Sequence, residues 1–153
     1  MADAKELGSA LEARFDFLGG KIAAPRPRRL YVEVAAERFR EVLEHAVREL
    51  RFDALCAITG LDDGATLAAI YHLSGAHGTV LNLRLRVPRD LPRIRTVTDL
   101  FPGAANYERE LDDLLGFEVE GLSPGRPYPL PDDWPRDQKP LRKDWKPAAP
   151  GAR

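Results

Sequence analysis

The sequence predicts an α+β fold, in which helices pack on an antiparallel or mixed sheet of about four strands and an extended, proline-rich C-terminal arm follows. Three observations lead to this prediction. Apolar and polar residues alternate strictly over residues 81–87, as in a strand with one exposed face. Over residues 39–50 the apolar residues recur at helical spacing. Eight of the thirteen prolines lie within residues 122–150, where they prevent regular structure.

The first half of the chain is expected to form two helices and two strands. An apolar stripe that ends at Gly19-Gly20 predicts the first helix, and Pro25-Arg26-Pro27 predicts an extended link. Residues 30–34 then form a strand, and the helix over residues 39–50 follows it. Residues 53–60 are apolar on both faces of a strand, which predicts a central strand with Cys56 as a small hydrophobic core residue.

The second half is expected to complete the sheet and to add a short acidic helix. Asp62-Asp63-Gly64 predicts a turn into a strand over residues 66–74, and a hairpin loop over 75–78 leads to the alternating strand. In the helix, Asn106 is expected at the N-cap and Gly116 in the left-handed position after the last turn. Its apolar stripe faces the core, while its acids face solvent: Glu108, Glu110, Asp112 and Asp113. The α+β domain thus covers residues 1–121 and the arm residues 122–153.

The charge balance is nearly even, with 24 acidic and 23 basic residues and a net charge of −1. The whole chain therefore offers no electrostatic case for binding nucleic acid or an anionic membrane surface. The arm from residue 122 onward carries seven basic and four acidic residues, so it is basic and the rest of the chain is acidic. The sequence has no apolar run of about 20 residues and no signal-peptide pattern. A cytoplasmic location, with membrane association only through partners, is expected.

No pattern in the sequence predicts a catalytic, cofactor or metal site. Residues 121–125 match the Gly-x-Ser-x-Gly motif of hydrolases, but the prolines that follow Ser123 forbid the helix which that motif requires. His45, His72 and His77 fall on a helix, a strand and a turn, and one cysteine cannot ligate an iron–sulfur cluster. The acids of the short helix have no nucleophile nearby, so docking or solvation is favoured over catalysis.

The arm contains both tryptophans, Trp134 and Trp145, next to basic residues. Disordered tails are poor in aromatic residues, so this composition is typical of anchor residues at a protein interface. Two alternatives remain. The arm could fold back over its own domain, or the tryptophans could stack on single-stranded nucleic acid, although four aspartates interrupt the positive charge.

The first motif is Tyr107 followed by Glu108-Arg109-Glu110, Asp113, Leu114-Leu115 and Gly116, and the second is the run Pro140-Leu141-Arg142-Lys143-Asp144-Trp145. Read with Pro131-Asp132-Asp133-Trp134, these two motifs resemble the 30 kDa subunit of the proton-pumping NADH:quinone oxidoreductases (respiratory complex I) and its relatives in membrane-bound nickel–iron hydrogenases. Between them the family usually has a His-Pro followed by paired arginines, whereas this chain has Leu122-Ser123-Pro124-Gly125-Arg126-Pro127.

The resemblance implies a cofactor-free, non-catalytic subunit of the peripheral arm of a respiratory oxidoreductase complex. Such a subunit would dock against the large quinone-site subunit and the iron–sulfur small subunit, on the cytoplasmic side of the membrane, and support electron transfer coupled to proton translocation. The equivalent subunit of an energy-converting hydrogenase is the near alternative, and a free-standing protein- or nucleic-acid-binding module the distant one. The expected docking residues are Tyr107, Glu108, Arg109, Glu110, Asp113, Arg126, Trp134, Arg142, Lys143, Asp144 and Trp145.

Overall fold

A computed structural model of the chain describes residues 3–148. Its elements follow in the order α1 (Ala4–Arg14), a 3₁₀ turn (Asp16–Leu18), β1 (Ile22–Arg26), β2 (Arg29–Ala35), α2 (Ala36–Arg48), β3 (Ala54–Asp62), β4 (Thr66–Ser74), β5 (Val80–Pro88), β6 (Arg93–Arg95), α3 (Ala104–Leu115) and β7 (Glu118–Glu120). The predicted α+β class with a mixed sheet is confirmed, and the main sheet has five strands rather than four.

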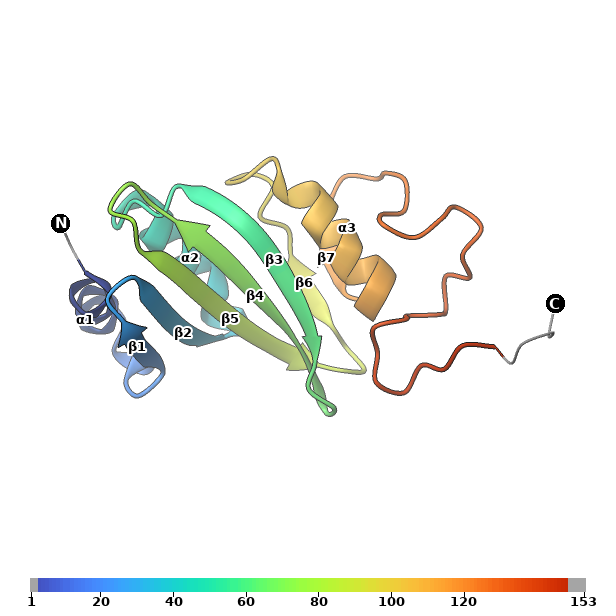
Figure 1. The fold of residues 1–153 in the computed structure, drawn as a ribbon, viewed down its shortest axis with the longest axis horizontal. Helices are drawn as coiled ribbons and strands as arrows, with labels where there is room; N and C mark the ends of the chain where they lie inside the picture. The colour runs from blue at the N-terminus through green and yellow to red at the C-terminus, as the bar shows by residue number, and fades with distance from the viewer. Residues whose placement is uncertain (1–2, 149–153) are drawn as a thin grey trace.

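The main sheet has the strand order β1-β2-β5-β4-β3 (Figure 1). β3, β4 and β5 form an antiparallel meander, whereas β2 runs parallel to β5 with Val32 opposite Leu83. The inward residues of β2, β4 and β5 alternate with outward ones, and α2 lies behind the inward face with Leu43 fully buried. Within residues 3–148 no helix covers the other face, and Tyr31 on it remains 48% exposed.

Strand β1 is missing from the sequence prediction, which treated Pro25 as part of a link. Proline is tolerated on edge strands, because there a backbone donor is not needed on the outer side. β1 is such an edge strand, and its pairing with β2 changes register between Ala23 and Arg26, on either side of the proline. The short parallel pair β6–β7 is also missing from the prediction, since three residues carry no readable alternation.

The prediction that residues 53–60 form a central strand with a buried Cys56 is wrong. β3 is the other edge of the sheet and has only β4 as a paired neighbour. Its inward face packs against α3, where Gly60 makes room for Leu111 and Leu115: a Cβ at Gly60 would lie 2.4–2.7 Å from their methyl groups. The pairing of β3 and β4 is irregular at Cys56, and its side chain is exposed on the open face, 3.4 Å from the Ser74 hydroxyl.

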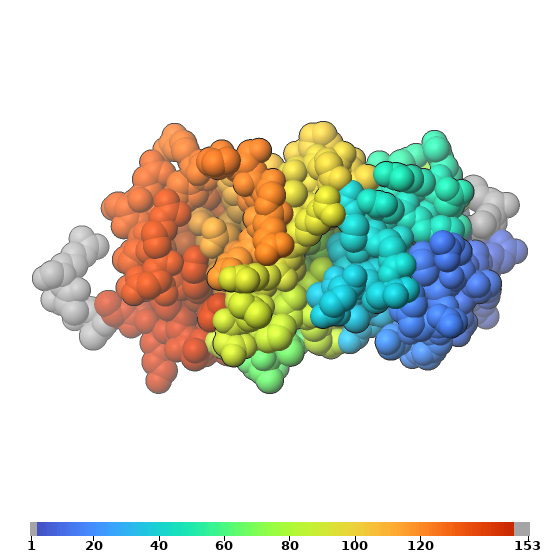
Figure 2. All heavy atoms as spheres, turned by 180° about the vertical axis from the view of Figure 1, so that it is seen from behind, coloured from blue at the N-terminus to red at the C-terminus, as the bar shows by residue number. Residues whose placement is uncertain are grey.

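The arm occupies one end of the molecule, opposite the N-terminal segments. Residues 122–148 contain no helix or strand, and residues 149–153 of the predicted arm lie outside the described residues. In the view from behind, the arm forms a continuous orange-to-red mass next to the chain around β6, while the blue N-terminal segments lie at the far end (Figure 2). Across the described part of the chain, no helix is long and apolar enough to cross a bilayer.

Candidate docking surface

Helix α3 carries most of the predicted docking residues and is bounded differently from the prediction. It begins at Ala104, two residues before Asn106, so the prediction that Asn106 is the N-cap is wrong. The Asn106 side chain instead accepts a hydrogen bond of 3.3 Å from Arg109. Gly116 ends the helix as predicted, with a φ of 80° and its N–H bonded to the Asp112 carbonyl at 2.8 Å.

Glu108 is fully buried, so the prediction that it lies on a solvated acidic face is wrong. Its carboxylate accepts hydrogen bonds from the Val97 N–H at 2.7 Å and from the Thr96 hydroxyl at 2.6 Å. Burial raises the pKa of Glu108 above its ordinary value, although these two donors act in the opposite direction. A carboxylate that satisfies buried donors in the loop before the helix is a structural residue, which fixes α3 to that loop.

Two further acids of α3 contact the arm: Asp113, which is buried, and Asp112, whose side chain is 56% exposed. The side chain of Asp113 is only 7% exposed, and it accepts a hydrogen bond of 3.3 Å from the Leu130 N–H and lies 3.8 Å from Arg136. Asp112 forms an ion pair of 3.1 Å with Lys139. The acidic character of this helix, which the sequence predicted to serve docking, therefore partly serves contacts with the chain's own basic arm.

The remaining α3 residues of the motif reach toward β3 and the arm. The Tyr107 hydroxyl donates a hydrogen bond of 3.0 Å to the Cys56 carbonyl, which ties the helix to the edge strand. Glu110 lines a groove of about 310 Å³ between α3 and β3, together with Leu114 and Leu141, and has no ion-pair partner among residues 3–148. It is the acid of this motif that faces open space.

Lys139 and the first residues of the second motif cap the C-terminus of α3. The last carbonyls of a helix lack partners within the helix and require donors from elsewhere. Here the Lys139 amine donates to the Asp112 carbonyl at 2.8 Å, the Leu141 N–H to the Leu114 carbonyl at 3.0 Å, and the Arg142 Nε to the Leu115 carbonyl at 2.7 Å. The positive charges of Lys139 and Arg142 also interact favourably with the negative end of the helix dipole.

The end of the same motif is held by Asp62, at the end of β3. The side chain of Asp62 is 2% exposed and accepts hydrogen bonds from Arg89, from the Gly64 N–H at 2.8 Å and from the Lys143 N–H at 2.7 Å. Arg89 also pairs with Asp144 at 2.5 Å. Burial opposes the ionisation of Asp62, but these donors outweigh it and hold the pKa of Asp62 well below its usual range.

The two tryptophans of the arm pack against each other. Their ring centroids are 6.1 Å apart, and Gln138 accepts hydrogen bonds from both indoles, with its carbonyl from Trp134 at 2.9 Å and with its side chain from Trp145 at 3.4 Å. Neither belongs to the hydrophobic core, and both remain partly accessible. The arm thus folds back on its domain over residues 139–144, while its aromatic pair stays at the surface.

Sequence reasoning missed Asp62, Arg89, Lys139 and Gln138. No local signal marks them, because the bond between Asp62 and Lys143 spans 81 positions and the Asp62-Asp63-Gly64 sequence is typical of any tight turn. The other candidates for chemistry remain scattered. No helix follows Ser123 as far as residue 148, and among the described residues no three His, Cys, Asp or Glu side chains converge as metal ligands.

The sequence profile of the family described as "Respiratory-chain NADH dehydrogenase, 30 Kd subunit" matches residues 32–150. A subunit of the F(420)H(2) dehydrogenase of Methanosarcina mazei is 33% identical over 147 residues, which cover 94% of this chain and 92% of that protein. Subunit 5 of the NADH-quinone oxidoreductase of Thermus thermophilus is 35% identical over 130 residues, which cover 76% of this chain and 61% of that protein.

The same similarity holds in three dimensions. A chain from the membrane-bound sulfane sulfur reductase, an archaeal respiratory membrane complex, superposes with a TM-score of 0.82 and 28% identity. The superposition covers 93% of this chain and 85% of that one. Because the match covers 93% of the chain, it includes at least part of the arm as well as most of the domain.

Proposed function

This chain belongs to the family of the 30 kDa subunit of respiratory-chain NADH dehydrogenase, and we propose that it acts as a non-catalytic, peripheral docking subunit of a complex-I-like respiratory oxidoreductase. Its homologues are subunits of multi-subunit membrane complexes, so partner subunits are implied. In this role the chain would orient and stabilise the subunits that carry electrons, in support of electron transfer coupled to proton translocation.

The observation that carries this proposal is that the arm is held against its own domain by specific contacts. An irregular segment rich in proline would ordinarily be mobile, yet here helix caps and a hydrogen bond to the buried Asp62 carboxylate hold it against α3 and β3. This fastening presents Trp134 and Trp145 together at the surface, where large, partly exposed aromatic side chains are typical anchors of protein interfaces.

The predicted docking residues divide into two groups in this proposal. The first group would position the surface through contacts within the chain: Tyr107, Glu108, Asp113, Arg142, Lys143 and Asp144. The second group would contact partners directly: Arg109, Glu110, Arg126, Trp134 and Trp145. In these terms residues 122–153 form a docking arm attached to an α+β domain of residues 1–121.

The proposed partners are the large quinone-site subunit and the iron–sulfur small subunit of the same complex, on the cytoplasmic side of the membrane. The arm supplies a basic, aromatic surface, and α3 supplies Glu110 beside an apolar groove, so one face offers both charge signs and anchor side chains. This chain would carry no cofactor of its own.

The proposal is tested by fractionating cells that express the full chain with an N-terminal affinity tag. We expect the chain in the membrane fraction, its release by conditions that strip peripheral proteins, and its co-purification with large and iron–sulfur subunits after mild detergent extraction. Recovery of the chain without any oxidoreductase subunit, from membranes that do contain the assembled complex, would contradict it.

A further inference from the structure

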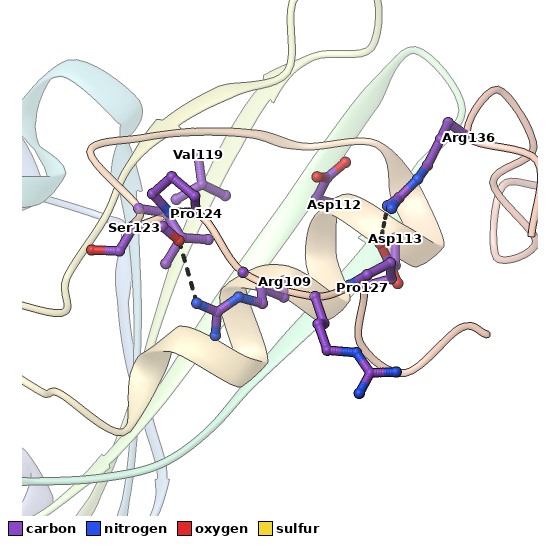
Figure 3. Close-up of a pocket in the computed structure, with 11 residues that line it drawn as sticks. Arg109, Asp112, Asp113, Val119, Ser123, Pro124, Pro127 and Arg136 are labelled. Carbon is purple, nitrogen blue, oxygen red and sulfur yellow. Dashed lines mark hydrogen bonds and ion pairs between the residues drawn. The ribbon is translucent and has the colours of Figure 1, made fainter. Parts of the chain in front are cut away.

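A pocket of about 240 Å³ lies between α3 and the first part of the arm (Figure 3). α3 contributes Arg109, Asp112 and Asp113 to its wall, and residues 122–127 of the arm form the opposite side. Arg136 closes it at the end near Asp113, where a dashed line in the figure marks their contact. Charged side chains of α3 and of the arm therefore line the pocket, and it exists because the arm is held against α3.

The charges that line this pocket do not balance. The wall contains Arg109, Arg126 and Arg136 against two aspartates, so its net charge is +1. Both aspartates are already paired, with Lys139 and with Arg136. Arg126, which is 84% exposed, pairs with Asp132 at 2.6 Å. Arg109 is the one charged residue of the wall without an opposite charge within 4 Å among residues 3–148.

The guanidinium of Arg109 is held in place, but most of its N–H groups have no acceptor among residues 3–148. It donates to the Asn106 side chain and to the Ser123 carbonyl, both at 3.3 Å and both neutral oxygens, so two of its five N–H groups are engaged and three are not. It lies directly over Gly125, where a Cβ would come within 2.6 Å of Nε and Nη2. Glycine at this position thus lets the guanidinium settle against the backbone.

We propose that this pocket receives an aspartate or glutamate side chain of a partner subunit, which forms an ion pair with Arg109. A planar guanidinium with free donors matches a carboxylate, which accepts two parallel hydrogen bonds from it. A single carboxylate neutralises the net charge of +1, whereas a doubly charged phosphate would leave a net charge of −1. This inference rests on the proposed function, because the carboxylate belongs to a docked subunit.

The experiment is a zero-length carbodiimide cross-link in the complex purified through the tagged chain. The Arg109→Lys variant places a reactive amine in the pocket while keeping its positive charge. We expect a cross-linked peptide that joins position 109 to an aspartate or glutamate of another subunit. The matched control is Arg93→Lys, which lies outside the pocket next to Glu118 of the same chain and is expected to form only internal links.

The outcomes separate this inference from the proposed function. If the Arg109→Lys chain recovers its partner subunits but position 109 links only to carboxylates of its own chain, or to none, the pocket inference is wrong and the docking role stands. If the wild-type chain recovers no partner subunits, both fail. A second variant, Arg109→Gln, should weaken partner recovery on the order of tenfold or more, as expected for loss of a charge-assisted pair at an interface, with an unchanged melting temperature.

Discussion

The carboxylate of Asp62, at the end of β3, accepts a hydrogen bond of 2.7 Å from the backbone N–H of Lys143, 81 positions further along the chain. This contact fastens the arm to the sheet, and Arg89 supports it by pairing with both Asp62 and Asp144. Removal of the Asp62 carboxylate should therefore lower the stability of the domain and loosen the arm as well.

Asp62→Ala should lower the free energy of unfolding by about 3 kcal/mol, because it leaves buried donors without their acceptor. For a domain of this size that corresponds to a drop in melting temperature of roughly 6–12 °C. Asp63→Ala is the matched control, since Asp63 pairs with Arg84 and Arg86 at the surface and should contribute no more than about 1 kcal/mol. Equal melting temperatures for the two variants would show that Asp62 does not fasten the arm.

The contribution of Asp62 should disappear in acid. Its pKa is lower in the folded chain than in the unfolded chain, so the stabilisation is complete above the unfolded value of about 3.9 and is lost as the pH falls through the folded pKa. Denaturant unfolding of the wild type and of Asp62→Ala should thus give a constant difference from pH 7 to about pH 5 and a shrinking one below it. A difference that grows on acidification would refute the assignment.

Charge reversal should separate the two glutamates of the Glu-Arg-Glu motif. Glu108→Lys buries an unpaired cation next to the Val97 N–H and should destabilise the chain by about 3 kcal/mol or more. Glu110→Lys changes a groove residue, so it should alter stability by only about 0.5 kcal/mol while reducing the recovery of partner subunits. Thermal unfolding and co-purification of both variants provide the measurement; a Glu108→Lys chain as stable as the wild type would contradict the buried role.

The tryptophan pair should matter for assembly more than for folding. Trp134→Ala and Trp145→Ala should each weaken docking by about 2 kcal/mol or more, as truncation of an interface anchor does. In the isolated chain each should cost only about 0.5–1.5 kcal/mol, the value of an aromatic pair outside a core. Partner recovery compared with melting temperature checks this, and a melting temperature lowered by about ten degrees, the scale of a lost core residue, would mean that the ring supports the fold.

The sequence predicted those parts of the structure in which a single periodicity dominates. The alternation of β5 and the stripe of α2 are each confirmed, because each element buries one face against the same core. The position of β3 was predicted wrongly, since an apolar run does not distinguish a central strand from an edge strand covered by a helix. Strand β1 was hidden by Pro25, which only an edge position tolerates.

The sequence named the expected docking residues but did not give their arrangement. The two motifs lie on segments that meet in the structure, yet the helical spacing of the apolar residues placed Glu108 on the solvated face, where it does not lie. Its burial depends on the Thr96–Val97 loop, and the capping of α3 by Arg142 depends on the path of the arm; both are long-range contacts without a local signal. Only the structure therefore shows whether an acidic residue of this helix faces solvent, bonds to the preceding loop or contacts the arm.

The docking role is tested most directly by the mass and protein composition of the particle that the tagged full-length chain forms in its native host. Native mass spectrometry of the detergent-extracted particle should show one copy of this chain together with the large and the iron–sulfur subunits. The Trp134→Ala and Trp145→Ala double variant should shift the chain toward the free form. A wild-type chain found only at its own mass, 17.1 kDa plus the tag, alongside an intact complex that lacks it, would contradict the docking role.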